Sequence, residues 1–221
     1  ELLSDRPHTF SIAAHTHTQF HAFLGPDQGW RGAEPHHHFV SATVSGSWWC
    51  GTFDELGIPH ATMNDGAPNG YSVITFDGAK YSIRFKAARR PGDYQMNIYL
   101  PSEIAAADAA QTELLVNVFA GSERSRVEMR FGRDGDWTPL EQTTTIDPAC
   151  LAMHELSTYL DQEVLGKKLD TVFGWKMDYP SKTTHMWKGT LPANPAPGTH
   201  TVFVRTTDMF GQDWRDERIL R

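Results

Sequence analysis

Alternating apolar and polar residues predict short β-strands along most of this chain. The alternation is clearest over residues 80–86, where every second side chain is Tyr, Ile or Phe, and a similar apolar run occupies residues 71–76. Asp77-Gly78 lies between these runs, and aspartate-glycine is typical of a hairpin turn in which both central residues need positive φ. We therefore expect a β-hairpin whose second strand carries its apolar residues on one face.

The other strand-like runs are separated by turns rich in Gly, Pro, Asn and Asp. They occupy residues 9–14, 39–44, 113–120, 126–131, 136–140, 183–190, 199–207 and 214–220. One helix interrupts the series. Asp147 is a favourable N-cap and Pro148 a favourable first helical residue, so the pattern predicts a helix from about residue 148 to residue 165, ending at Gly166.

The length of 221 residues allows one or two domains. Residues 105–110 are rich in alanine with charged interruptions, which is typical of a segment that links two units. We therefore predict two domains, at residues 1–104 and 105–221. The regular spacing of short strands in the second domain indicates a β-sandwich, with the helix attached to it. The predicted fold class is mainly β.

Charge and composition narrow the classes of ligand. The chain has 20 Lys and Arg against 27 Asp and Glu, a formal net charge of −7. No basic run interrupts this excess, so electrostatic binding of nucleic acid or anionic lipid is disfavoured. No stretch approaches the roughly 18 consecutive apolar residues of a membrane-spanning helix, so we expect no membrane partner. A small neutral or metal-bridged ligand suits this surface better.

The two cysteines, Cys50 and Cys150, are far apart in the sequence. This separation excludes a Cys-x-x-Cys zinc site and a dense disulfide framework. One long-range disulfide and two reduced thiols both remain compatible with the sequence.

Histidine is concentrated at the start of the chain, and this is where candidate chemistry lies. Seven of the eleven histidines fall in the first 38 residues. They are His8, His15, His17, His21, His36, His37 and His38. His15 and His17 follow the predicted strand 9–14, and residues two apart in an extended segment project to the same face. Two imidazoles at this spacing can bind one metal ion or two neighbouring ions. Exposed or hydrogen-bonded histidines are the ordinary alternative, and the one we favour for residues 36–38.

These motifs carry a resemblance. The strand that ends in Ala14-His15-Thr16-His17 resembles the last signature of the calcineurin-like metallophosphoesterases, in which a strand ends in Gly-His-x-His; Ala14 departs from that pattern. Five further sequence motifs resemble those of the bacterial branch of this family, whose members have an added C-terminal domain. They are Pro-His-His-His at 35–38, Gly-Ser-Trp-Trp at 46–49, Asp-Gly-Ala-Pro-Asn-Gly-Tyr at 65–71, Phe-Asp-Gly at 76–78, and the segment from Pro197 to Gly211. The resemblance covers nearly the whole chain.

The resemblance implies hydrolysis of phosphate esters by a binuclear metal centre. By position, His15 and His17 are the transferred ligands, usually one to each ion. Nitrogen ligands suit zinc, iron or manganese with little discrimination. The resemblance also favours a periplasmic or extracellular location.

The family's other signatures, Asp-x-His, Gly-Asp-x-x-Asp and Gly-Asn-His, do not occur in the sequence. The chain therefore resembles the last strands of a metallophosphoesterase sandwich followed by an immunoglobulin-like β-sandwich with one helix. We expect this chain alone to bind metal poorly or not at all and to be inactive. Strands of a divided sandwich leave unpaired edges, so residues 1–50 could pair between copies as a homo-oligomer.

Two further interpretations stay open. A polar loop containing His60, Asn64, Asp65 and Asn69 could border the substrate, although ordinary turn chemistry explains the same residue types. The alternative function is a carbohydrate-binding β-sandwich without catalysis, in which tryptophan rings stack on sugars. It would need three or more rings in one exposed row among Trp48, Trp49, Trp137, Trp175, Trp187 and Trp214.

Overall fold

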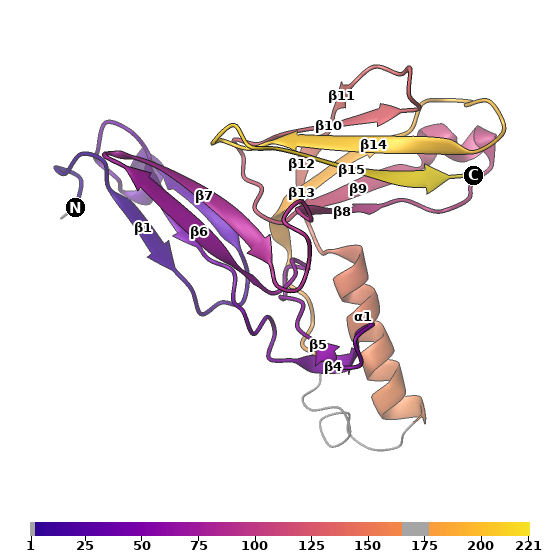
Figure 1. The fold of residues 1–221 in the computed structure, drawn as a ribbon, viewed down its shortest axis with the longest axis horizontal. Helices are drawn as coiled ribbons and strands as arrows, with labels where there is room; N and C mark the ends of the chain where they lie inside the picture. Colours follow the sequence, from indigo (N-terminus) through magenta and orange to yellow (C-terminus); the bar gives the residue numbers. More distant parts are fainter. Residues whose placement is uncertain (1–2, 165–176) are drawn as a thin grey trace. The chain divides into compact units, whose positions relative to one another are not determined.

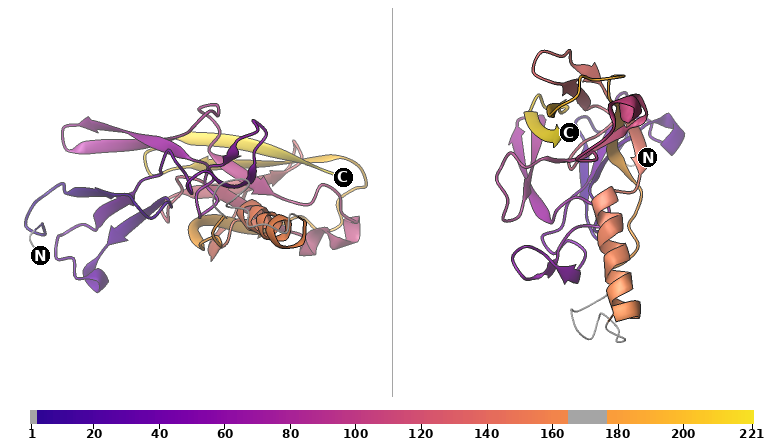
Figure 2. Two further views of the ribbon diagram at one scale, coloured as in Figure 1. Left: turned by 90° about the horizontal axis from the view of Figure 1, so that it is seen from below. Right: turned by 90° about the vertical axis from the view of Figure 1, so that its right-hand side faces the viewer.

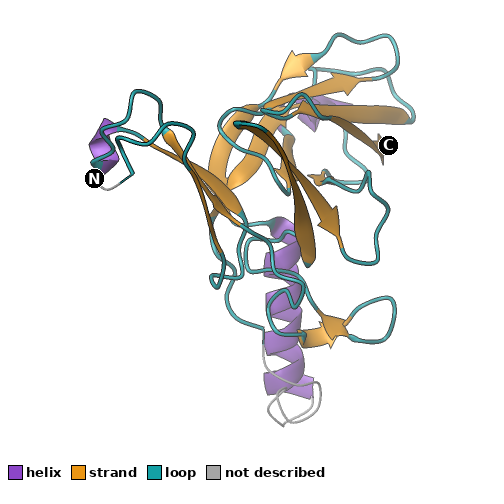
Figure 3. Cartoon of the chain, turned by 60° about the vertical axis from the view of Figure 1, so that its left-hand side comes forward, coloured by secondary structure: helices purple, strands orange, loops and turns teal. Residues whose placement is uncertain are grey.

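The computed structural model describes residues 3–164 and 177–221, and it is mainly β with one main helix, as predicted (Figures 1 and 3). The chain forms two compact units. Unit 1 contains Glu1–Pro91 and Ile146–Thr183, and unit 2 contains Gly92–Thr145 and Thr184–Arg221. The domain division at residues 104 and 105 stays a prediction. In the described part of the chain, no helix is long and apolar enough to cross a membrane.

Unit 1 begins with a sheet of three strands. They are β1 (Phe10–Ala13), β2 (Phe20–Leu24) and β3 (His36–Val40). The order is β1-β3-β2, with β1 parallel and β2 antiparallel to the central strand β3. The predicted strand at 9–14 is confirmed, whereas the one at 39–44 begins earlier and contains the three consecutive histidines. The outer edges of β1 and β2 have no partner strand among the described residues, and pairing between copies through them stays a prediction.

The consecutive histidines of β3 are held by hydrogen bonds on both faces of the sheet. Ser11 Oγ lies 2.7 Å from Nε2 of His36 and 2.8 Å from Nδ1 of His38. On the opposite face, His37 Nε2 lies 2.8 Å from Nδ1 of His21. Burial, together with the neighbouring His38, lowers the pKa of His36. These histidine side chains are therefore hydrogen-bonded within the sheet, which is the interpretation favoured for residues 36–38 from the sequence.

The predicted hairpin is present (Figure 2), and the strand pairing shifts its turn by one residue. Its strands are β6 (Gly70–Asp77) and β7 (Lys80–Ala87). Asp77 belongs to the first strand, and the turn residues are Gly78 and Ala79. Only Gly78 has positive φ, at 58°, which is the pattern of a type II′ turn with glycine first. Ile83 and Phe85 are buried on one face of β7, as predicted.

The main helix, α1 (Pro148–Tyr159), starts where the sequence predicts. The Asp147 side chain accepts a hydrogen bond of 2.9 Å from the Cys150 backbone N–H, and Pro148 is the first helical residue. A π-helical turn, Leu160–Val164, follows α1. The predicted end at Gly166 lies outside the described residues.

The helix belongs to unit 1, whereas the sequence placed it with the second domain. It lies beside β4 (Cys50–Phe53), which pairs with β5 (Pro59–His60). Cys50 and Cys150 are buried free thiols that pack with Met177. Of the two alternatives left open by the sequence, a disulfide and two reduced thiols, the structure shows the reduced thiols. A contact between α1 and residues about 100 positions earlier has no local sequence signal.

Unit 2 is a β-sandwich of two four-stranded sheets. One sheet has the order β12-β13-β9-β8, with strands β8 (Met96–Tyr99), β9 (Glu113–Val118), β12 (Glu141–Thr145) and β13 (Thr183–Thr190). The other has the order β11-β10-β14-β15, with strands β10 (Arg126–Phe131), β11 (Thr138–Pro139), β14 (His200–Thr207) and β15 (Asp213–Leu220). Ile98 and Val116 from the first sheet share one buried core with Val127 and Val204 from the second. The predicted strands of this region are present, and the one at 136–140 is shortened to the two residues of β11.

The alanine-rich segment is part of unit 2 rather than a link between units. It forms a 3-10 helix, Ala106–Gln111, in which Ala109 is fully buried in the sandwich core. The preceding Ile104 N–H donates a 2.8 Å hydrogen bond to the carbonyl of Arg221. Alanine here fits a small space in the core, and composition alone does not distinguish this role from that of a linker.

Replacing the helix cap tests whether α1 depends on it. We expect Asp147→Ala to lower the free energy of unfolding of unit 1 by about 1 kcal/mol, because the Cys150 N–H loses its acceptor. Urea unfolding followed by the helical circular dichroism signal measures this change. Glu155→Ala, at an exposed position of the same helix, is the matched control and should change stability far less. Equal effects of the two substitutions would contradict the capping role.

The ion pairs of Glu128 predict a pH dependence of stability. Its carboxylate accepts hydrogen bonds from Arg205 at 2.7 Å and Arg126 at 3.0 Å, and the Arg205 bond holds the pKa of Glu128 below its ordinary value. A depressed carboxyl pKa stabilises the fold above the unfolded value of about 4.3, and this stability is lost as pH falls through the folded value.

We therefore expect Glu128→Gln to be less stable at pH 7 and to lose less stability on acidification. Thermal unfolding between pH 7 and pH 3 measures both effects. The control is Glu141→Gln, because the Glu141 side chain is 76% exposed and lies 3.7 Å from Lys188. A wild-type pH profile in Glu128→Gln would refute the assignment.

Candidate functional site

The candidate site lies where two parallel strands of unit 1 end. β1 and β3 run in the same direction, so the segments that follow them, residues 14–19 and 41–49, leave the same edge of the sheet. Ligand sites commonly form at the carboxyl ends of parallel strands. The first segment contains the His-x-His motif, and a third segment, residues 61–70, packs against both.

Polar side chains join the second and third segments. Ser47 Oγ donates to the Asn64 side-chain carbonyl at 2.7 Å, and its N–H donates to the Thr62 carbonyl at 3.2 Å. Asn69 Nδ2 donates to the Val44 carbonyl at 2.7 Å. Asn64 and Asn69 therefore hold the loop that follows β3, and their role in substrate binding stays a prediction.

Asp65 connects the third segment to the histidine segment. Its side chain is buried, and one carboxylate oxygen accepts from the Ala67 N–H at 3.0 Å. The other oxygen accepts from the backbone N–H of Gln19, just after the His-x-His motif. A buried carboxylate that accepts two backbone N–H groups fixes the position of the chain around it.

His60 lies apart from this network, in β5, where it pairs with Cys50. Burial lowers the pKa of His60, and the nearby carboxylates of Asp54 and Glu55 oppose that shift. Of the four residues predicted to border a substrate, the structure thus places Asn64, Asp65 and Asn69 in one segment with His60 outside it.

The His-x-His segment has a different conformation from the predicted one. His15 and His17 have φ of 85° and 54°, so they do not lie in an extended strand, and the same-face argument fails. Trp48 and Trp49 in the second segment also have positive φ, at 68° and 54°. These four account for more than half of the seven non-glycine residues with positive φ in the described chain. Each such residue costs about 1 kcal/mol or more, and such strain clusters at functional sites.

One hydrogen bond fixes the His17 ring. Its Nδ1 contacts the carbonyl oxygen of Gly46, and because a carbonyl oxygen can only accept, Nδ1 carries the proton. Nε2 of the neutral ring then keeps a free lone pair. The Trp48 ring packs on His17 with centroids 4.5 Å apart and planes inclined at 34°. His15 is exposed and makes no hydrogen bond with its side chain among the described residues.

This arrangement suits a metal ligand at His17. Metal-binding histidines usually donate their second ring N–H to a carbonyl or carboxylate, which fixes the tautomer and the ring orientation. His15, two residues away, is available as a second nitrogen ligand. Within residues 3–164 and 177–221, no three His, Cys, Asp or Glu side chains are grouped to hold a metal ion. The role of His15 and His17 as metal ligands therefore stays a prediction, and two nitrogen ligands would make up half of a typical four-ligand zinc site.

The described tryptophans do not form the row that sugar stacking would need. Trp187 is buried in the sandwich core and Trp214 packs against it. The Trp137 ring lies 4.3 Å from the Arg205 guanidinium. Among the described tryptophans, Trp48 and Trp49 have the most exposed side chains. Trp175 lies outside the described residues.

The position of Gly46 can be tested by adding one methyl group. A Cβ there would lie 1.7 Å from the Ala61 carbonyl oxygen, whereas a Cβ at Gly57 would meet nothing within 4 Å. Both glycines have positive φ, so Gly57→Ala controls for backbone strain. We expect Gly46→Ala to lose roughly 2 kcal/mol more stability than Gly57→Ala in urea unfolding. Equal losses would contradict the close approach.

The comparison with known protein families covers residues after the histidine segment. A family model described as the C terminal of calcineurin-like phosphoesterase matches residues 38–214, most of the chain. The match begins in β3 and runs through both units to β15. Among curated proteins, none matches this sequence. The chain therefore belongs to the family that forms the C-terminal part of calcineurin-like phosphoesterases.

Proposed function

We propose that this chain forms part of a metal-dependent hydrolase of phosphate esters, in which His15 and His17 ligate the metal centre. Membership of a phosphoesterase family supports the reaction class. The location of both histidines after β1, at the carboxyl end of a parallel strand pair, supports their role.

The hydrogen bond between His17 Nδ1 and the Gly46 carbonyl carries this proposal. It leaves Nε2 as the ligating atom and directs the ring. Gly46 also accepts a 3.1 Å hydrogen bond from Thr43 Oγ1, which fixes the carbonyl itself. The Trp48 ring restricts rotation of the imidazole from one side. Because the His17 ring is already ordered, metal binding costs less side-chain entropy than it would with a freely rotating ring.

The donor set fits zinc, iron or manganese, all of which accept imidazole nitrogen. When bound, such ions supply Lewis-acid stabilisation of phosphoryl oxygens and an activated water nucleophile. The residues of this chain contribute ring orientation and the fixed loops around it. With two candidate ligands, we propose that the chain alone hydrolyses phosphate esters negligibly, because the parts of such a centre act as one unit.

We further propose that unit 2 is an immunoglobulin-like sandwich. Naming its strands from β8 to β15 as A, B, C, C′, D, E, F and G gives one sheet in the order D-E-B-A and the other in the order C′-C-F-G. This is the constant-type immunoglobulin order with one added edge strand, C′.

Substitution of the two histidines tests the metal assignment. In the longest natural form of the protein, we expect His15→Ala and His17→Ala each to lower metal content and turnover of p-nitrophenyl phosphate together. His8→Ala is the matched control, because His8 is an exposed histidine that precedes β1 and lies outside the segment that follows it. Metal analysis and steady-state assays with zinc, iron or manganese give the two readouts. Unchanged metal content and turnover in both variants would refute the assignment.

The tautomer of His17 can be measured without any metal. Long-range proton–nitrogen correlation spectra of the 221-residue chain, recorded where the His17 ring is neutral, should show its proton on Nδ1. The Nε2-protonated form would contradict the hydrogen bond on which the ligand role depends.

A further inference from the structure

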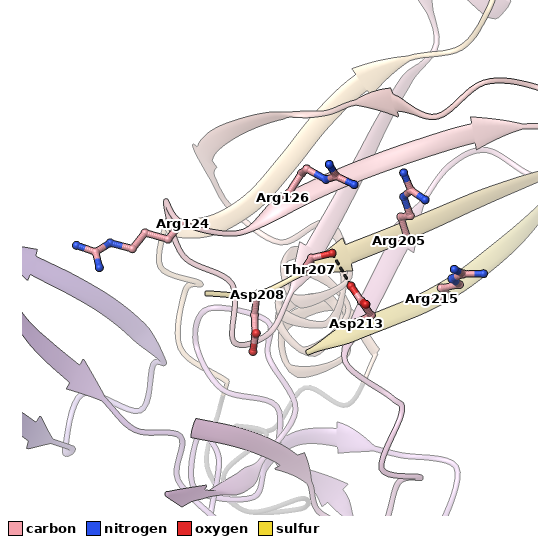
Figure 4. Close-up of a pocket in the computed structure, with 7 residues that line it drawn as sticks. All are labelled: Arg124, Arg126, Arg205, Thr207, Asp208, Asp213 and Arg215. Carbon is pink, nitrogen blue, oxygen red and sulfur yellow. Dashed lines mark hydrogen bonds between the residues drawn. The ribbon is translucent and has the colours of Figure 1, made fainter. Parts of the chain in front are cut away.

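A group of arginines lies on the outer face of one sheet of unit 2, remote in sequence from the histidine segment. It surrounds an open hollow of about 500 Å³ (Figure 4). The lining residues are Arg124, Arg126, Arg205, Thr207, Asp208, Asp213 and Arg215. We call this feature the arginine hollow. Its volume lies within the range of pockets that hold small molecules.

The strand register places three of these arginines on one face. Arg205 on β14 lies directly opposite Arg215 on β15, and Arg126 on β10 lies opposite Thr207. The alternate residues Val204 and Thr206 are buried toward the sandwich core, so the arginines face outward. Figure 4 shows Arg126, Arg205 and Arg215 pointing to the same side of the sheet. Like charges directly opposite on neighbouring strands destabilise a sheet, so packing within the sheet does not explain this pair.

The arginine hollow is only partly neutralised. One carboxylate, Glu128, serves both Arg126 and Arg205. Arg215 is exposed and makes no hydrogen bond or ion pair with its side chain in the described part of the chain. The Arg126 side chain is 64% exposed despite its ion pair. Guanidinium donors therefore remain available above the sheet.

The two aspartates of the lining have other partners. Asp208 accepts hydrogen bonds of 2.8 Å from the N–H groups of Phe210 and Gln212, and Figure 4 shows it pointing away from the arginines. Asp213 accepts from the Thr207 hydroxyl. The lining and Glu128 together hold four arginines against three carboxylates, an excess of one positive charge on a chain whose formal net charge is −7.

Part of the arginine hollow is already rigid. Glu128 holds Arg205 through Nε, and the Trp137 ring lies 4.3 Å from the same guanidinium. Ordering a long side chain before binding removes an entropic cost from the binding step. Arg205 is therefore a preorganised donor, flanked by the more exposed Arg126 and Arg215.

We propose that the arginine hollow binds a small ligand that carries two or more phosphate groups. The planar guanidinium matches phosphate oxygens in bidentate fashion. Arg126, Arg205 and Arg215 come from three adjacent strands, which lie about 4.8 Å apart, so they spread over roughly 10 Å. A single phosphate contacts one or two of them, whereas a ligand with several phosphates reaches all three strands. This site is independent of His15 and His17.

Calorimetric titration of the 221-residue chain tests the ligand class. The probes are tripolyphosphate, orthophosphate and citrate, at equal ionic strength and without added metal. We expect saturable 1:1 binding of tripolyphosphate, with orthophosphate and citrate at least about tenfold weaker. No binding of tripolyphosphate, or equal binding of all three, would overturn the proposal.

Two variants locate the site. Arg215→Gln and Arg126→Gln should each weaken tripolyphosphate binding about tenfold, the loss expected for one charge-assisted contact. Arg133→Gln is the matched control, because it removes the same charge at an exposed position outside the lining. It should retain affinity within about twofold. If all three substitutions weakened tripolyphosphate binding equally, with unchanged thermal unfolding midpoints, the effect would be one of general charge. That result would overturn the proposed location of the site.

Discussion

The carbonyl group of Gly46 connects the segments that form the candidate site in unit 1. It accepts from His17 in the segment after β1 and from Thr43 in the segment after β3. The chain around Gly46 in turn touches Ala61 so closely that no side chain fits between them. A backbone atom thus sets the position of the imidazole, and the side chains of the third segment set the position of that backbone.

Much of the fold could be predicted because burial on one face leaves a clear alternation. β10 and β13 begin and end at the predicted residues 126–131 and 183–190. Strands that lack this pattern were missed. Glu141–Thr145 contains no apolar residue, and Met96–Tyr99 has only four residues. The alternation arises where one face of a strand is buried. An edge strand or a very short strand buries too few residues to produce a recognisable alternation.

The candidate site was predictable in its residues and not in its conformation. The His-x-His motif after a strand identified His15 and His17, but residue type gives no sign that both adopt positive φ. The partner of His17 is a main-chain carbonyl 29 residues away, and a carbonyl has no sequence signature. The arginine hollow was missed for a related reason, since its members come from separate strands that only the sheet register brings together.

The two buried thiols of unit 1, Cys50 and Cys150, have low reactivity while the structure stays closed. Burial raises the pKa of Cys50 to about 11, with the carboxylate of Asp178 adding to the shift, and burial also raises the pKa of Cys150. Only the thiolate is nucleophilic, so both cysteines are protected from alkylation at neutral pH while the structure stays closed. Their rate of modification reports how often the helix α1 separates from β4. The alkylation rate of Cys50 and Cys150 is therefore a direct measure of local opening in unit 1.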